Sequence, residues 1–214
     1  MTERTTDDLI AMLAKDTKAI GASAAGQRLA LGLCVGAALT LLWVARMGWR
    51  HDLATAAGGL NFWVKLGYTA LLAVIAVHWL RRLGRPESAQ PRFVWLLMPM
   101  AALGLIAVIQ LSQASPGTMP QMIYGRSWHI CSRNIIMLAL PIYLATLWVM
   151  RQFAPTRLTM AGAASGLVSG AMAATLYCLH CPETSMLFVL IWYSLGMAAA
   201  TVVGALLGPH VLRW

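Results

Sequence analysis

Two short groups of residues hold most of the side chains that could do chemistry in this chain. Cys178-Leu179-His180-Cys181-Pro182-Glu183 follows a long apolar run, and His129-Ile130-Cys131 precedes another. Thiols, imidazoles and a carboxylate can bind soft metals, form disulfides or undergo oxidation. We therefore expect any sensing or reaction to take place at these two groups.

Cys131 and Cys181 could serve in three ways if the two groups lie together. Packed helix axes are about 8–10 Å apart and a disulfide needs Cα atoms within about 7 Å, so a structural bridge requires only a modest inward lean. A soft-metal site would use four ligands, Cys131, Cys181, His129 and His180. The third use is redox switching of an exposed thiolate. The alternative to all three is inert packing.

Inert packing is the interpretation that fits the other two cysteines. Cysteine behaves as a small apolar residue inside apolar helices. Cys34 lies in the middle of an apolar run, and Cys178 lies near the end of another. Cys178 also forms a C-x-x-C with Cys181, which leaves it in reserve as a metal ligand or a local bridging partner.

Composition places the chain in a membrane. Hydrophobic residues make up 59% and charged residues 11% of its 214 residues, and its mean hydropathy is +0.69. A soluble domain of this length could not bury so much apolar surface. The first two dozen residues contain four acids and no apolar core, so we expect no cleaved signal peptide.

Six apolar runs predict an all-α integral membrane bundle of six transmembrane helices, since about 20 apolar residues span a bilayer. The runs are 29–47, 64–80, 93–111, 135–153, 158–179 and 186–207. A short connection around Pro155 makes the fourth and fifth runs antiparallel neighbours, which brings Cys131 and Cys181 to the same end. Glycines at four-residue spacing, Gly162, Gly166 and Gly170, predict close helix packing.

The distribution of Lys and Arg predicts the orientation of the bundle. Eleven of these residues fall in the first, third, fifth and last polar segments, and five fall in the alternate loops. Because basic residues concentrate on the cytoplasmic side, both termini are expected in the cytoplasm and the thiols on the outer face. The chain then divides into a cytoplasmic segment, 1–26, and a transmembrane domain, 27–214.

The N-terminal segment is expected to form a short helix. Thr5 and Asp8 resemble a capping box, and Leu9, Met12 and Leu13 share one face of such a helix. So short a helix is marginal alone in water. It would either lie on the membrane surface or fold on a partner protein.

Several classes of function are disfavoured by what the sequence lacks. No Asp or Glu falls inside an apolar run, which disfavours coupled transport. No Ser-His-Asp arrangement, H-E-x-x-H, nucleotide fingerprint or nucleic-acid motif is present, so neither hydrolysis nor direct nucleic-acid binding is expected. A membrane thiol oxidoreductase is the rival interpretation, but it needs two communicating cysteine pairs, and Cys34 lies too far along its run to reach the others.

Several motifs resemble the NrsF-type membrane anti-sigma factors. The likeness extends over essentially the whole chain and rests on the following stretches: Thr6-Asp7-Asp8-Leu9-Ile10, Phe62-Trp63-Val64-Lys65, Cys131, Leu179-His180-Cys181-Pro182-Glu183, Phe188, Trp192-Tyr193, Leu195-Gly196, Leu206-Leu207-Gly208-Pro209 and Leu212-Arg213-Trp214. The H-C-P-E stretch followed by W-Y-x-L-G is fairly specific.

The resemblance implies a regulator rather than an enzyme. Proteins of this kind hold an extracytoplasmic-function (ECF) sigma factor at the bacterial inner membrane and release it under oxidative or heavy-metal stress. The matching thiols, Cys131 and Cys181, would sense the signal, with no cofactor beyond a transiently bound heavy metal. The sigma factor would contact the N-terminal segment at Asp7, Asp8, Leu9 and Leu13. The signal, the cognate sigma factor and the oligomeric state are not specified by the sequence.

Overall fold

Helices make up nearly all of the chain that the structure describes. This computed structural model describes residues 22–84, 94–115, 117–153 and 155–213, together with Thr6 and Met12. Its long helices are α2 (Ala22–Met47), α4 (Leu60–Leu83), α5 (Val94–Ser112), α7 (Trp128–Arg151), α8 (Leu158–Tyr177) and α10 (Ser194–Val211). The short elements are α3 (Leu53–Ala57), α6 (Met119–Tyr124), α9 (Met186–Phe188) and the π-helical segment η1 (Val189–Tyr193), and α9, η1 and α10 follow one another without a break.

Six helical stretches among the described residues are long and apolar enough to cross a membrane. The predicted all-α fold and its six long apolar helices are therefore confirmed. The ends differ by a few residues. The fourth span begins at Trp128 instead of Ile135, so Cys131 lies inside the first turn of α7, and α8 ends at Tyr177 instead of Leu179. The short helices α3 and α6 were not predicted.

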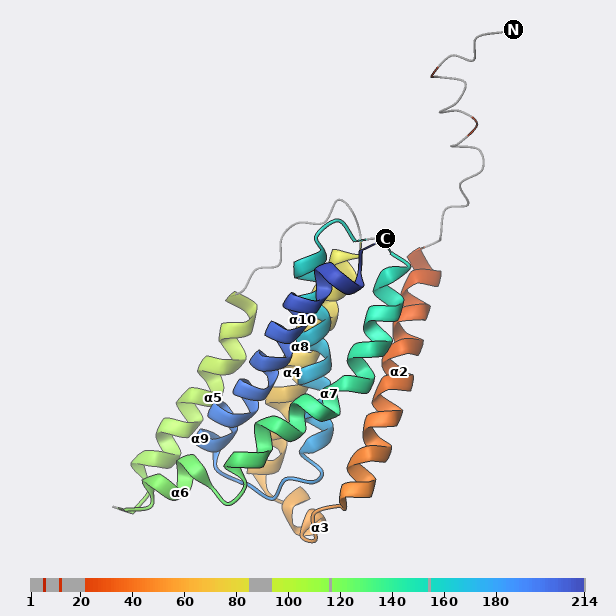
Figure 1. Cartoon of the computed structure of the whole chain (residues 1–214). Helices are drawn as coiled ribbons and strands as arrows, with labels where there is room; N and C mark the ends of the chain where they lie inside the picture. Colours follow the sequence, from red (N-terminus) through yellow and green to blue (C-terminus); the bar gives the residue numbers. More distant parts are fainter. Residues whose placement is uncertain are drawn as a thin grey trace, which may run out of the picture.

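Helix α8 occupies the centre of the bundle (Figure 1). It packs against α10, α7 and α4, while α2 packs mainly along α7. Helix α5 lies at the margin, and an apolar cavity of about 340 Å³ lies among α4, α5, α8 and α10. The central position of α8 places its last turn, and the loop that follows it, within reach of most other helices.

Glycines allow α8 to approach α10 so closely. A Cβ atom added at Gly162 would overlap the carbonyl oxygen of Gly204, and one added at Gly166 would overlap the carbonyl oxygen of Ala200. Side-chain-free positions let two helix backbones come into contact where lipid supplies no hydrophobic driving force. The packing predicted for the glycine stripe is thus confirmed.

One sequence expectation is wrong, and another falls on residues outside the described ranges. Cys34 was expected to pack within the bundle, but it is exposed on the surface of α2. Both faces of a lipid-immersed helix are apolar, so the sequence pattern does not tell which face meets protein. The predicted N-terminal helix, with Asp7, Asp8, Leu9 and Leu13, lies outside the described residues except for Thr6 and Met12, which are helical and exposed.

Candidate thiol site

Three of the four cysteines lie together at the end of the bundle where α3 and α6 are found. Cys131 projects from the first turn of α7, and Cys178 and Cys181 lie in the turn that follows α8. All three thiols are free and none is exposed to solvent. Cys131 and Cys181 belong to the same buried cluster, and Cys131 has the largest effect on the pKa of Cys181. The structure therefore brings together the two cysteines that the sequence singled out.

The turn after α8 is held by its own backbone. The Cys178 N–H donates to the Ala174 carbonyl at 3.2 Å, and the N–H groups of His180 and Cys181 both donate to the Tyr177 carbonyl at 3.0 Å. Pro182 follows, and because it has no N–H it cannot continue the helical pattern. These bonds fix the Cys181 side chain relative to the axis of α8. We refer to Cys178–Glu183 as the thiol loop.

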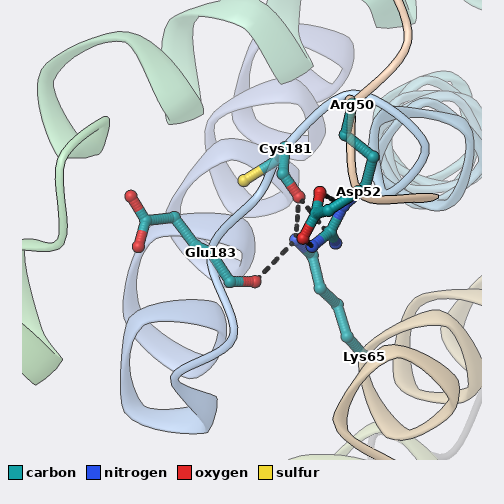
Figure 2. Close-up of polar contacts among 5 residues, drawn as sticks. All are labelled: Arg50, Asp52, Lys65, Cys181 and Glu183. Atoms are coloured by element: carbon teal, nitrogen blue, oxygen red, sulfur yellow. Dashed lines mark hydrogen bonds and ion pairs between the residues drawn. The ribbon is translucent and has the colours of Figure 1, made fainter. Parts of the chain in front are cut away.

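Lys65 anchors the thiol loop from α4 (Figure 2). Its ammonium donates to the carbonyl oxygens of Cys181 at 3.1 Å and Glu183 at 3.2 Å, and it lies 4.8 Å from the centre of the Tyr193 ring. Only 1% of the residue is exposed. Burial of an ammonium is costly unless its protons are bonded, and here two carbonyls and an aromatic face satisfy it. Lys65 is therefore one of the side chains that hold the loop in its conformation.

Arg50 approaches the same loop from the connection that follows α2 (Figure 2). Its Nη1 donates to the Cys181 carbonyl at 3.4 Å, and its Nε and Nη2 donate to the two carboxylate oxygens of Asp52 at 2.8 and 2.7 Å. The bond from Arg50 lowers the pKa of Asp52 below its usual value of 3.8. Two cations thus converge on one carbonyl oxygen, and only one of them has a carboxylate partner among the described residues.

Glu183 connects the thiol loop to the start of α7. Its Oε1 accepts from the Arg126 N–H at 2.7 Å and from the Ser127 hydroxyl at 3.2 Å. Gly125 has a φ of +53°, and a Cβ atom there would lie 2.6 Å from the Glu183 carboxylate. Glycine is therefore required at this position both for its backbone conformation and for the space it leaves. Since α7 carries Cys131 in its first turn, this connection fixes the position of the Cys131 thiol relative to the Cys181 thiol.

The environments of the two loop thiols differ although they are three residues apart. The neighbouring Cys131 thiol lowers the pKa of the Cys181 thiol from its usual value of 9.0, and the Lys65 charge and the Glu183 backbone act in the same direction, against the opposite effect of burial. Burial raises the pKa of Cys178 to about 11. The Cys178 thiol donates to the Ala174 carbonyl at 3.3 Å, as expected of a packing residue. Cys181 is therefore the sulfur of the loop that favours the reactive thiolate form.

The π-helical segment η1 forms the wall beside the thiol pair. π-Helical turns are rare and are found frequently at functional sites. Here the segment carries Trp192, whose carbonyl accepts from the Ser132 hydroxyl at 2.7 Å and whose Nε1 donates to the Ile123 carbonyl at 2.8 Å. Tyr193 follows, with a fully buried hydroxyl that has no hydrogen-bond partner among the described residues. These contacts join η1 to α6 and to the residue of α7 that follows Cys131.

The structure separates the histidines from the thiols. His129 is exposed and its ring contacts Trp128, while His180 bonds through Nδ1 to the Gly48 carbonyl at 2.7 Å. Within the described ranges, no three His, Cys, Asp or Glu side chains gather closely enough to hold a metal ion. The four-ligand set is thus not assembled here, and metal binding stays a prediction. The expectation of an exposed thiolate is wrong, because Cys131 and Cys181 are both fully buried.

Sequence reasoning missed the two cations of the site. Arg50 and Lys65 were counted as topology signals in the outer loops, and Lys65 also as part of a family motif, but neither was expected at the thiols. A usable signal was present for Lys65, because it follows Phe62, Trp63 and Val64 at the start of an apolar run, where a basic side chain has a cost unless it is paired. Arg50 offered no such signal.

Comparisons with known proteins agree with the resemblance seen in the sequence. A family model described as "NrsF: Negative regulator of sigma F" matches residues 13–214. The "Probable anti-sigma-F factor NrsF" of Azospira oryzae is 42% identical over 212 residues, and the "Anti-sigma-F factor NrsF" of Caulobacter vibrioides is 41% identical over 216 residues. In each case the match covers 98% of this chain and 99% of the relative.

No solved structure matches the chain. The two relatives are regulators by name, which supports the expectation of a regulatory protein and removes the thiol oxidoreductase as its rival. A family model that spans nearly the full length, together with two full-length relatives above 40% identity, leaves no ambiguity about descent: the chain belongs to the NrsF family of negative regulators of sigma F.

Proposed function

We propose that this protein is an inner-membrane anti-sigma factor that holds an ECF sigma factor and releases it when Cys131 and Cys181 are oxidised or bind a heavy metal. The observation that carries the proposal is the pairing of these two thiols, at the end of a six-helix bundle, in a chain whose relatives are named anti-sigma-F factors. The relatives' names supply the sigma factor as partner, and the thiol pair supplies a chemical input.

Oxidation of the pair follows from the chemistry of the two sulfurs. A peroxide oxidises the Cys181 thiolate to a sulfenic acid and is itself reduced to water or an alcohol. The Cys131 sulfur then attacks the Cys181 sulfur, a disulfide forms, and the sulfenic oxygen leaves as water with the proton of Cys131. Because both thiols are buried, the loop must open locally before the oxidant can reach them.

A heavy metal is the second input. Soft cations prefer thiolate ligands, and binding to the two sulfurs would release their protons. Either input replaces two neighbouring free thiols by a bonded unit of different geometry. A signal can bias a two-state element only when it interacts differently with its two states.

The sigma factor is proposed to contact the N-terminal segment, 1–26, at Asp7, Asp8, Leu9 and Leu13. The acidic and apolar character of these residues suits a segment that folds on a partner. The proposal also places the termini on the cytoplasmic side, which the distribution of basic residues favours.

Co-purification from solubilised membranes tests the function. A sigma factor should be recovered with the full chain under reducing, metal-free conditions, and not with a chain that lacks residues 1–26. Peroxide should release it from the full chain, while Cys131→Ser and Cys181→Ser should hold it in both conditions. Recovery with both chains would move the contact to the inner loops, and failure to recover any sigma factor would overturn the proposal.

A further inference from the structure

Helix α2 ends directly on the thiol loop. The backbone N–H of Arg50 donates to the Leu179 carbonyl at 3.1 Å, and the ring of His180 bonds to the Gly48 carbonyl at 2.7 Å. The guanidinium of Arg50 adds its bond to the Cys181 carbonyl at 3.4 Å. Gly48 has a φ of +93°, which ends the helix and directs the chain toward the loop. Three consecutive loop residues, 179–181, are therefore bonded to residues 48–50.

Arg50 is the firmest of these connections. Only 2% of its side chain is exposed, and both oxygens of Asp52 hold its guanidinium in place. A bidentate pair of this kind fixes geometry as well as adding binding energy. Because Arg50 bonds the loop through both its backbone and its side chain, a shift of Cys181 would pull on the end of α2.

Helix α2 is also held along its length, independently of Arg50. Thr40 donates to the Leu138 carbonyl of α7 at 3.0 Å, and a Cβ atom at Gly36 would lie 2.7 Å from the Ile142 Cα. At the opposite end from the thiols, Arg28 donates to Gln152 at 2.8 Å. These contacts keep α2 seated on α7 when the thiol loop exerts no force on it.

The opposite end of α2 continues directly into the N-terminal segment. Ala22 is preceded in the chain by the residues that the proposed function assigns to sigma-factor binding. A helix is a stiff element, so a displacement at one end is transmitted to the other. No other long helix in the described part of the chain both follows the N-terminal segment and ends on the thiol loop.

We propose that Arg50 is the positioning residue that couples the thiol loop to α2, so that α2 transmits the state of the Cys131–Cys181 pair to the sigma-binding segment. This inference rests on the proposed function. Disulfide formation draws the two sulfur atoms to a separation of about 2.0 Å, which moves Cys181 toward α7. The loop carbonyls that Arg50 holds move with it, and α2 follows.

The test separates the chemistry of the thiols from its transmission. Arg50→Gln removes the charged fork and keeps a polar side chain of similar length. Arg46→Gln is the matched control, because Arg46 is an exposed arginine in the last turn of the same helix. Each variant is purified with its sigma factor and treated with hydrogen peroxide. Disulfide formation is followed by the gel shift of maleimide-labelled thiols, and release by the sigma factor that remains bound.

In Arg50→Gln, the disulfide should form as in the parent protein, but release of the sigma factor at a given degree of oxidation should fall by about tenfold. That factor corresponds to the loss of one charge-assisted hydrogen bond. Arg46→Gln should release normally. His180→Ala, which removes the Gly48 contact without changing Arg50, should lower release by a smaller factor and provides a second measurement if Arg50→Gln is poorly inserted.

Three results would overturn the inference. Normal release from oxidised Arg50→Gln would show that Arg50 does not transmit. Release of the sigma factor from Arg50→Gln before oxidation would show that α2 is not held along α7 in the absence of Arg50. Loss of disulfide formation would show that Arg50 serves the thiol pair itself. Failure of the parent protein to hold or release a sigma factor would instead count against the proposed function.

Discussion

At the residue scale, the thiol loop gives Cys181 and Cys178 opposite tendencies. The pKa of Cys181 is lowered by the neighbouring Cys131 thiol, by Lys65 and by the Glu183 backbone, while burial raises the pKa of Cys178 to about 11. Thiolates, not thiols, react with electrophiles. The loop therefore contains one sulfur that favours the reactive thiolate, Cys181, and one that favours the unreactive thiol, Cys178.

We expect iodoacetamide to alkylate Cys181 at lower pH than Cys178 in the purified protein. A lowered pKa means that the Cys181 thiolate forms at lower pH than that of an ordinary thiol, whereas Cys178 stays protonated until near its pKa of about 11. Lys65→Met should move the midpoint of the Cys181 profile to higher pH, because the positive charge that favours the thiolate is removed. Mass spectrometry of the two peptides gives both profiles.

Lys65→Arg is the control for this measurement, since it keeps the charge and the capacity to donate to the two carbonyls. A change in the rate without a change in the midpoint would indicate loop opening and not electrostatics. Equal midpoints in the parent protein and Lys65→Met would contradict the role given to Lys65.

The limits of sequence reasoning are clearest for Arg50 and Lys65. Both occur near span ends, where basic residues usually set topology, and their burial arises from a loop more than a hundred positions away in the chain. The thiol pair was predictable because helix connectivity alone brings Cys131 and Cys181 to the same end. The burial of both sulfurs was not predictable, because it depends on η1 and the Glu183 contact.

At the scale of elements, the contact between α8 and α10 brings two helix backbones closer together than any other contact in the described bundle. Gly166 meets the backbone of α10, where an added Cβ atom would overlap the Ala200 carbonyl oxygen. A helix backbone cannot rotate aside as a side chain can, so the two helices would have to separate along their length.

Gly166→Ala should therefore lower the free energy of unfolding by about 1–3 kcal/mol, the usual cost of overpacking. Gly67→Ala is the matched control in α4, because nothing lies within 4 Å of an added Cβ atom there. That change should be neutral or stabilising by up to about 1 kcal/mol, since alanine favours a helix more than glycine does. Unfolding in mixed detergent micelles measures both, and equal effects would contradict the packing argument.

The six long helices were predictable because the bilayer fixes their length and composition. The packing of the glycine stripe was also predictable, because membrane helices pack closely through small residues. The exposure of Cys34, in contrast, depends on which face of α2 meets α7. In lipid both faces are apolar, and the periodicity that marks a buried face in a soluble protein is lost.

At the scale of the whole molecule, six membrane crossings would place both termini of the chain on one side of the membrane. The bias of Lys and Arg predicts that this side is the cytoplasm. A phosphatase fused after residue 126 should be active, since it would be exported, and one fused at the C-terminus should be inactive. A fluorescent protein at the C-terminus should give the complementary result. The opposite pattern would place the thiols in the reducing compartment and remove the basis for a disulfide switch.

The complete burial of Cys131 and Cys181 also affects how the protein would respond over time. When a reagent captures each opened molecule before it can close again, the reaction proceeds at the rate of opening and no longer depends on reagent concentration. Above that threshold, a stronger dose of oxidant produces no faster response, and only a longer exposure converts more molecules. The fraction of molecules with an oxidised pair would thus depend on how long the oxidative stress lasts, and brief peaks in oxidant concentration would have little effect.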